Sequence, residues 1–216
     1  MCVSSLFAAT VDKKHQTLRF FHNFVLFLRV LTKNVYFEMS TIKIHDREFV
    51  KSIPAEEIAA RVKMVAERIN KDYAGRRPLL LGVLNGCFMF VSDLMKNLEI
   101  ECEISFVKFS SYQGAETTGT VKQLVGLAES IEGRDVIVVE DIVDTGLTMH
   151  KMLETLASEN PASISIASLF LKPARLRVPV EVKYSAFEIP DRFIVGYGLD
   201  YDGLGRNLPD VYDVKE

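Results

Sequence analysis

The residues best suited to chemistry lie in one short stretch, DVIVVEDIVDTGLT. Glu140 and Asp141 follow a run of apolar residues, and the hydroxyls of Thr145 and Thr148 flank a turn at Gly146. These hydroxyls and the backbone N–H groups at the start of the next helix can bind a phosphate. The two carboxylates would repel a polyphosphate, but they can accept hydrogen bonds from vicinal sugar hydroxyls or neutralise a magnesium ion carried by the ligand. The stretch therefore predicts a site for a sugar with a terminal phosphate.

Alternating apolar patterns predict the elements that position this stretch. Helical periodicity starts at Pro54 and returns at about 88–97 and 147–159. Apolar runs predict buried strands at 79–84, 102–109, 135–139, 163–171, 182–187 and 193–197. The alternation predicts an α/β domain with a largely parallel sheet, in which ligands bind beyond the carboxyl ends of the strands. The polar stretch 110–120, which contains two glycines, predicts a hairpin or a mobile loop.

The charge of the chain is unevenly distributed. Its 216 residues hold 26 Lys and Arg against 29 Asp and Glu, a formal charge of −3. Residues 1–38 carry five bases and two acids (+3), which leaves 21 bases and 27 acids (−6) for residues 39–216. This acidic part lacks the basic footprint that usually accompanies nucleic-acid binding. Three Cys without CxxC spacing favour a reducing, cytoplasmic setting over a disulfide scaffold or a zinc site.

The amino-terminal stretch has the pattern of neither a membrane span nor a secretory signal. Its most apolar segment, LRFFHNFVLFLRVL, is interrupted by Arg19, His22, Asn23 and Arg29 and is shorter than the roughly 20 apolar residues that a span needs. No A-x-A-like cleavage site follows it. An amphipathic surface helix is an alternative. We expect residues 1–38 to be a dispensable or disordered extension, residues 39–216 to be the functional domain, and the protein to have no membrane partner.

The segment VEDIVDTG resembles the phosphoribosyl pyrophosphate (PRPP) motif of the type I phosphoribosyltransferases, in the form found in their 6-oxopurine branch. The resemblance implies that family's fold, with a largely parallel central sheet flanked by helices, a small hood built from N- and C-terminal segments, and a mobile hairpin lid. It also implies that this stretch binds PRPP. The residues expected to do so are Glu140, Asp141, Asp144, Thr145, Gly146, Leu147 and Thr148.

A second segment, FEIPDRFIVGYGLDYDGLGRNL, resembles the hypoxanthine-guanine phosphoribosyltransferases. The resemblance implies that Phe193 stacks on the purine and that the backbone at Ile194 meets the edge of the base. It places Asp200 at a magnesium site and Arg206 on pyrophosphate. These roles suit the chemistry of an aromatic face, a carboxylate and a guanidinium. With Glu140 and Asp141, Asp200 completes the expected magnesium-binding residues.

Three further positions match the same family. Lys172 ends the apolar run 163–171, and by resemblance it donates to the 6-oxo group of the purine. Leu84, Asn85 and Gly86 match the pyrophosphate-binding loop, in which the peptide before the second residue can be cis. Many relatives have Lys at the middle position, so Asn85 removes one charge. Ser111 and Tyr112 match the pair of residues in the mobile lid.

The resemblance implies a magnesium-dependent purine salvage enzyme that joins hypoxanthine, and guanine, to PRPP. Its partners would be PRPP and a 6-oxopurine base, without nucleic acid, in a homodimer or homotetramer. Asp144 is the expected catalytic base, which takes the proton from purine N7; its alternative role is to cap the following helix. Two other functions stay open: transfer to xanthine or another base, and a PRPP-sensing regulator that binds RNA or DNA.

Overall fold

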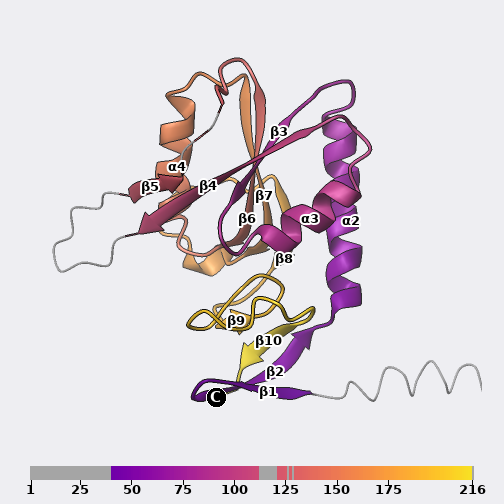
Figure 1. Cartoon of the computed structure of the whole chain (residues 1–216), viewed down its shortest axis with the longest axis vertical. Coiled ribbons are helices and arrows are strands. Elements are labelled where there is room, and N and C mark those ends of the chain that lie inside the picture. The colour runs from indigo at the N-terminus through magenta and orange to yellow at the C-terminus, as the bar shows by residue number, and fades with distance from the viewer. Residues whose placement is uncertain (1–39, 112–120, 126, 128, 216) are drawn as a thin grey trace, which may run out of the picture. The chain divides into compact units, whose positions relative to one another are not determined.

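A six-stranded sheet with the order β5-β4-β3-β6-β7-β8 forms the centre of the structure (Figure 1). The computed structural model describes residues 40–111, 121–125, 127 and 129–215. The strands are β3 (Leu79–Val83), β4 (Glu103–Ser111), β5 (Val121–Val125), β6 (Asp135–Val143), β7 (Ser163–Leu171) and β8 (Tyr184–Glu188). Neighbouring strands are parallel, except that β4 and β5 are antiparallel. The predicted α/β class with a largely parallel sheet is confirmed.

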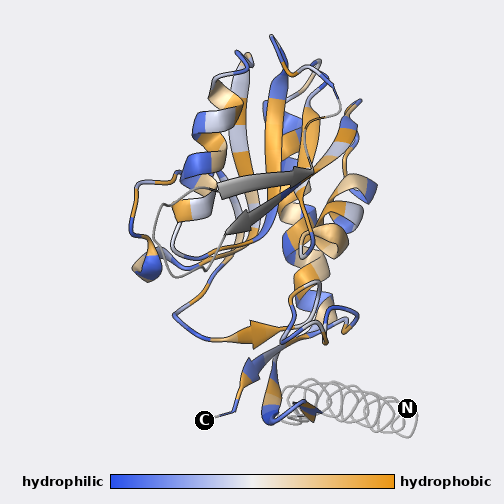
Figure 2. Ribbon diagram, turned by 60° about the vertical axis from the view of Figure 1, so that its left-hand side comes forward, coloured by the Kyte–Doolittle hydropathy of each residue, from blue (hydrophilic) through white to orange (hydrophobic). Residues whose placement is uncertain are grey.

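Helices cover both faces of this sheet. The helices α2 (Ala55–Asp72) and α3 (Phe88–Lys96) pack on one face, and α4 (Leu147–Ala157) packs on the other. Leu80 lies in the core beneath α2 and α3, whereas Leu79 and Leu81 lie in the core beneath α4. Because successive side chains of a strand point to opposite faces, strands covered on both sides are apolar at nearly every position. These strands carry long hydrophobic runs, whereas hydrophobic and hydrophilic residues alternate along the helices (Figure 2).

A smaller sheet joins the two ends of the described chain. Its strands are β1 (Thr41–Ile44), β2 (Arg47–Ile53), β9 (Ile194–Val195) and β10 (Val211–Val214), in the order β1-β2-β10-β9. All three pairings are antiparallel. Phe49, Val195 and Tyr212 are buried in its own small core. This sheet is the hood that the resemblance implied, built from N- and C-terminal segments.

Several element boundaries differ from the predicted ones. The strand predicted at 193–197 is only two residues long, because Gly196 (φ 104°) and Tyr197 (φ 48°) turn the chain away from the hood. The strand predicted at 135–139 continues to Val143, so Glu140 and Asp141 lie within β6 rather than after it. Neither β1, β2 nor β10 was predicted, because these short strands mix polar and apolar residues and depend on pairing with distant segments.

The predicted hairpin is present where the structure describes it. Strands β4 and β5 pair antiparallel up to Ser111 and Val121. The tip between them, which includes Tyr112, lies outside the described residues.

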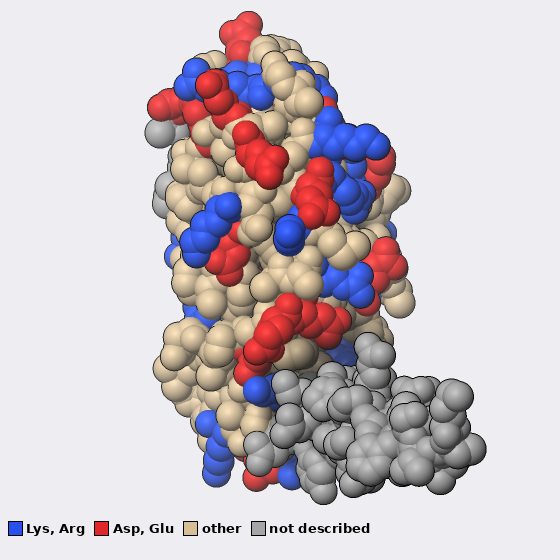
Figure 3. All heavy atoms as spheres, turned by 90° about the vertical axis from the view of Figure 1, so that its right-hand side faces the viewer, with Lys and Arg blue, Asp and Glu red and all other residues tan. Residues whose placement is uncertain are grey.

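Charged side chains of both signs are interspersed on the face that carries α2 (Figure 3). The described Lys and Arg residues on this face therefore do not form a continuous basic patch.

Candidate active site

Three loops meet at one edge of the central sheet, because β3, β6 and β7 are adjacent and parallel. The loop after β3 begins at Leu84, the loop after β6 at Asp144, and the loop after β7 at Lys172. The backbone N–H of Lys172 donates to the carbonyl of Val143 at 3.0 Å, which ties the second and third loops together. The topology thus brings together the residues that sequence reasoning assigned to phosphate, pyrophosphate and purine.

The acid pair near the end of β6 is half-buried. Burial raises the pKa of Glu140 well above its usual value, and the negative charge of Asp141 raises it further. Burial likewise raises the pKa of Asp141, although the positive charge of Arg206 acts in the opposite direction. Such carboxyls gain stability in their charged forms when a ligand supplies a cation or hydroxyl donors.

Glycine is required where the loop after β3 passes the acid pair. A Cβ atom built on Gly86 would lie 1.4 Å from Oδ2 of Asp141. On the other side of this loop, a Cβ atom on Gly198 would lie 2.0 Å from the carbonyl oxygen of Gly86. The pyrophosphate loop is therefore held closely between β6 and the carboxy-terminal segment. Its Leu84–Asn85 peptide is cis, as the resemblance allowed, and the side chain of Asn85 is exposed.

The turn before α4 leaves the amino terminus of this helix free for an anion. Gly146 is the N-cap residue, has a φ of 76°, and makes no side-chain cap hydrogen bond. The first turn of α4 contains no acidic residue. Helix N-terminal N–H groups carry partial positive charge and need acceptors, so this end favours a phosphate.

A cavity of about 230 Å³ lies next to this turn. It is small beside the roughly 300–1,000 Å³ of typical ligand pockets. Its lining residues are Val83, Leu84, Glu140, Ile142, Val143, Asp144, Thr145, Gly146, Thr148 and Met149. The cavity therefore joins members of the predicted acid pair, phosphate turn and pyrophosphate loop, whereas Leu147 is exposed and does not line it.

Lys172 is buried and has carboxylate partners. Its side chain is only 8% exposed, and its Nζ lies 3.4 Å from Oδ1 of Asp191 and 3.9 Å from Oδ2 of Asp144. Arg175 contacts the same two carboxylates: its Nε donates to Oδ1 of Asp144 and its Nη1 to Oδ2 of Asp191, both at 3.0 Å. Asp144 is thus an ion-pair partner of Arg175, and the cap position of α4 belongs to Gly146.

Sequence reasoning did not identify Arg175 or Asp191 as site residues. Arg175 follows Lys172 by three residues and lies in the 3-10 helix η1 (Pro173–Arg175), whose tight turn returns its side chain towards the sheet edge. The sequence offered two signals for these residues: Arg175 is a second cation close to Lys172, and Asp191 is an acid within the segment FEIPDRF. Their contact depends on a turn that no local sequence pattern predicts.

The expected purine-stacking ring lies on the hood. Phe193 is 41% exposed, and its ring centroid lies 6.2 Å from that of Phe49 and 5.7 Å from that of Tyr201. The guanidinium of Arg47 lies 5.9 Å from the same ring. Ile194 is buried in β9, so its contribution to a ligand must come from its backbone.

The chain is similar to known proteins over most of its length. Residues 50–202 match the family described as Phosphoribosyl transferase domain. The chain belongs to this family. A hypoxanthine-guanine phosphoribosyltransferase of Streptococcus thermophilus is 42% identical over 162 residues, which cover 74% of this chain and 90% of the relative. A hypoxanthine phosphoribosyltransferase of Salmonella typhimurium is 43% identical over 162 residues, covering 74% and 91%.

Solved structures of the phosphoribosyltransferase family give the same result. A crystal structure of a hypoxanthine phosphoribosyltransferase from Staphylococcus aureus has a TM-score of 0.73 and 40% identity, and it covers 76% of this chain and 90% of the other. The predicted fold and the predicted enzyme class, a phosphoribosyltransferase, are confirmed. No helix in the described part of the chain is long and apolar enough to cross a membrane.

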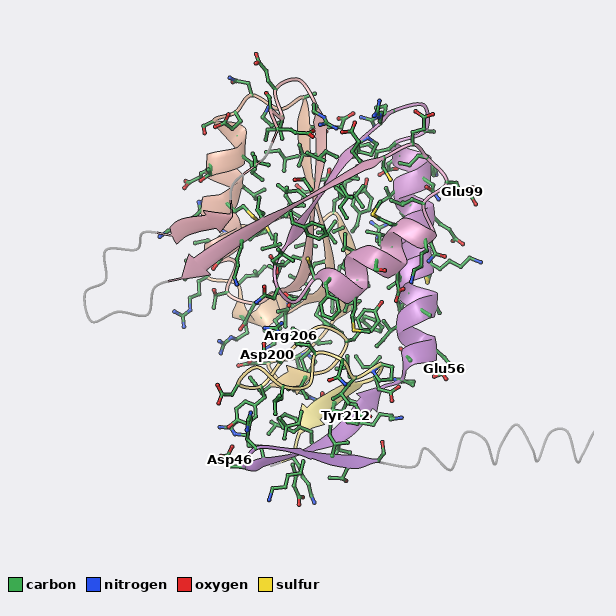
Figure 4. All side chains as sticks on the ribbon, in the orientation of Figure 1. Asp46, Glu56, Glu99, Asp200, Arg206 and Tyr212 are labelled. Atoms are coloured by element: carbon green, nitrogen blue, oxygen red, sulfur yellow. The ribbon has the colours of Figure 1, made fainter. Side chains whose placement is uncertain are left out.

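The three acids expected to bind magnesium do not lie together in this phosphoribosyltransferase. Among the described residues, no group of three or more His, Cys, Asp and Glu side chains is placed to hold a metal ion. Asp200 instead pairs with Arg206, whose Nη2 lies 2.6 Å from its Oδ1, and it accepts from the backbone N–H of Gly203 at 2.7 Å. Figure 4 shows Asp200 and Arg206 side by side on the carboxy-terminal segment. The described acidic side chains alone therefore do not form a complete metal site.

Proposed function

We propose that this phosphoribosyltransferase transfers the 5-phosphoribosyl group of PRPP to hypoxanthine and guanine, forming IMP and GMP and releasing pyrophosphate in purine salvage. The observation that carries the proposal is the arrangement at one sheet edge. There, a half-buried acid pair near the end of β6, the start of α4 and the buried ammonium of Lys172 lie at adjacent strand ends. The names of the relatives support the choice of a 6-oxopurine as acceptor.

PRPP fits this edge with each charged part opposite a suitable group. The 5′-phosphate accepts hydrogen bonds at the start of α4, with the hydroxyls of Thr145 and Thr148 beside it. The ribose hydroxyls donate to Glu140 and Asp141. The pyrophosphate lies against the loop of Leu84, Asn85 and Gly86, and Arg206 adds its charge once it separates from Asp200.

Magnesium fits the acid pair. Glu140 and Asp141 are adjacent oxygen donors, which Mg²⁺ prefers, and their raised pKa values mark a place where positive charge is favourable. Glu140 and Asp141 would face the ion directly, whereas Asp200, which lies apart from them and is paired with Arg206, would contribute only on the pyrophosphate side. When bound, magnesium would neutralise the charge that develops on the leaving pyrophosphate.

The purine binds between the hood and the sheet edge in this proposal. Phe193 supplies an exposed ring for stacking, and the backbone at Ile194 meets the edge of the base. Lys172 donates to the 6-oxo group, which selects an acceptor there over the amino group of adenine. To do so, its ammonium exchanges contacts with Asp144 and Asp191 for the purine oxygen, which is possible because both contacts are longer than 3.3 Å.

The reaction forms one bond and breaks one. Purine N9 attacks ribose C1, the bond from C1 to the pyrophosphate oxygen breaks, and the oxygen leaves with the electron pair. Positive charge builds on the sugar as this bond breaks, and the nearby carboxylates of Glu140 and Asp141 favour it. Asp144 accepts the proton that leaves purine N7. Closure of the hairpin through Ser111 and Tyr112 would exclude water, which would otherwise capture the activated sugar.

We also propose that residues 39–216 contain the complete catalytic unit, as a cytoplasmic homodimer or homotetramer. The two sheets and all three loops lie after Ser40, and contacts group Thr41–Glu216 as one unit. A chain that starts at Met39 should keep the activity and solubility of the full chain. A loss of either would show that residues 1–38 are needed.

One assay tests the main proposal. The protein is incubated with PRPP, magnesium and one of hypoxanthine, guanine, xanthine or adenine, and the nucleotide and pyrophosphate are measured together. The expected result is equal formation of nucleotide and pyrophosphate with hypoxanthine and guanine, and none with adenine. Exclusive use of xanthine would change the assigned substrate. No nucleotide from any base would refute transfer and favour a PRPP-binding regulator.

A further inference from the structure

Arg175 lies next to the proposed active site but has no role in the mechanism described above. It closes the turn η1 directly after β7, where its backbone N–H donates to the carbonyl of Lys172 at 3.0 Å. Two residues later, the backbone N–H of Arg177 donates to the carbonyl of Thr145, also at 3.0 Å. The segment after β7 is therefore fixed to the phosphate turn through its backbone, and Arg175 projects from a defined position.

The guanidinium of Arg175 joins two loops. Its Nε donates to Oδ1 of Asp144, on the loop between β6 and α4, and its Nη1 donates to Oδ2 of Asp191, between β8 and β9. Both distances are 3.0 Å. Because a guanidinium is planar and rigid, these two bonds fix the position of Asp144 relative to the segment that carries Phe193.

The bonds also distinguish the two oxygens of Asp144. Oδ1 is occupied by the hydrogen bond from Arg175, whereas Oδ2 faces only the more distant ammonium of Lys172, at 3.9 Å. When Lys172 turns to a purine 6-oxo group, Oδ2 becomes free while Oδ1 stays bound. The hydrogen bond to Asp144 also raises the pKa of Arg175, so the guanidinium stays charged throughout.

We propose that Arg175 is a positioning residue, which orients Asp144 so that its Oδ2 faces purine N7, with Asp191 as the second anchor of the guanidinium. The proposal rests on the function proposed above, because it gives Asp144 the role of base. It assigns Arg175 no contact with PRPP or purine. Its loss should therefore slow the chemical step and leave PRPP binding nearly unchanged.

The first test compares Arg175→Ala with Arg177→Ala in the full chain. Arg177 is exposed, lies on the same segment, and uses only its backbone in the contact with Thr145, so its replacement removes a nearby charge without touching Asp144. The single-turnover rate with excess enzyme and saturating PRPP reports the chemical step. Arg175→Ala should lower it about 10- to 100-fold, as expected when a catalytic group is misplaced by about 1 Å. The KM for PRPP should change less than about threefold, and Arg177→Ala should match the parent.

The second test asks whether Arg175 acts through Asp144. In an Asp144→Asn background, replacing Arg175 by Ala should cost less than about threefold, because the group that it positions is already disabled. Arg175→Lys keeps the positive charge but loses the planar guanidinium that donates to both Asp144 and Asp191, so it should give an intermediate rate. This variant also serves as the test if Arg175→Ala does not fold. The proposal is refuted if Arg175→Lys keeps the full rate, if the two losses multiply, or if the KM for PRPP rises with an unchanged rate. An inactive parent protein would instead refute the proposed function.

Discussion

The two longest described helices begin in opposite ways. The first turn of α2 contains Glu56 and Glu57, and the backbone N–H of Ala55 donates to Oδ1 of Asp210 at 2.8 Å (Figure 4 labels Glu56). The first turn of α4 contains no acid, and its N-cap residue Gly146 makes no side-chain hydrogen bond. Both ends carry the same partial positive charge, and their first N–H groups have no partners within their own helix. The protein supplies an acceptor at α2, whereas at α4 the proposed acceptor is the phosphate of the substrate.

The acids near the starts of α2 and α4 also differ, in the direction in which their pKa values are shifted. Burial alone would raise the pKa of Asp210, but its hydrogen bonds with Lys51 and with the backbone N–H of Ala55 lower the pKa below its usual value. Burial raises the pKa values of Glu140 and Asp141. The charged form of Asp210 is therefore stabilised by the protein's own residues, whereas burial disfavours the charged forms of Glu140 and Asp141. This contrast separates structural from functional use of the same chemistry.

Asp144→Asn tests whether this acid before α4 acts in chemistry or only in its contact with Arg175, and it has the largest expected effect. Asn keeps an oxygen that can accept from Arg175, so a purely structural role would leave the rate of the chemical step nearly unaltered. If Asp144 is the base, its replacement by Asn should lower the single-turnover rate about 100- to 10,000-fold. PRPP affinity, measured by calorimetric titration, should change less than about threefold. A mutant with the parent's rate would remove Asp144 from the mechanism.

Leu147→Glu places at α4 the kind of acid that α2 already has. Leu147 is 41% exposed, so the new side chain is sterically tolerated. The carboxylate should raise the KM for PRPP by up to about 1,000-fold, because two charges near 4 Å apart at a protein surface repel by about 4 kcal/mol and every 1.4 kcal/mol is a factor of ten. It should also raise the Tm slightly, since an acid favours a helix amino terminus.

Glu57→Gln is the matched control for this exchange. It removes an acid from the first turn of α2, and it should cost about 0.3–1 kcal/mol of stability with the KM for PRPP unaltered. If Leu147→Glu left the KM for PRPP at the parent value, α4 would not be the phosphate site.

Asp210→Asn weakens the internal acceptor at α2. The change removes the charge opposite Lys51 and weakens the bond from Ala55, so it should lower the free energy of unfolding by about 1–3 kcal/mol at neutral pH. Because the folded-state pKa is lowered, the stabilisation is present above the unfolded pKa and is lost as pH falls through the folded value. Urea unfolding at several pH values should show the mutant converging with the parent at low pH. A constant difference would mean that charge is not the cause.

Glu140→Gln should change stability in the opposite direction to Asp210→Asn. The folded-state pKa is raised, so the folded protein holds more protons than the unfolded chain between the two pKa values, and stability falls as pH rises through that interval. Above the interval, Gln should raise the Tm by about 2–4 °C, which corresponds to about 1 kcal/mol for a chain of this size. The increase in Tm that magnesium and PRPP produce in the parent should be smaller in the mutant. A lower Tm at neutral pH would show that the Glu140 charge is already compensated in the free protein.

The sequence predicted the central sheet well because each of its parallel strands carries its own apolar run. The run 163–171 coincides with β7, and the acids and Gly146 that predict the phosphate site are close together in the sequence, before α4. Three of the hood strands, β1, β2 and β10, could not be predicted, because β2 and β10 are held together by pairing over about 160 residues of sequence. The partners of Asp144 were missed for the same reason: Arg175 is 31 residues away, and a 3-10 turn brings it near.

The binding mode of PRPP tests the central claim most directly. A crystal structure of the full chain with PRPP and magnesium, without a purine, would locate both ends of the ligand. The account predicts the 5′-phosphate within hydrogen-bonding distance of the backbone N–H groups at residues 146–149, with the ribose hydroxyls towards Glu140 and Asp141. A 5′-phosphate bound elsewhere, with the start of α4 empty or occupied by the pyrophosphate, would contradict it.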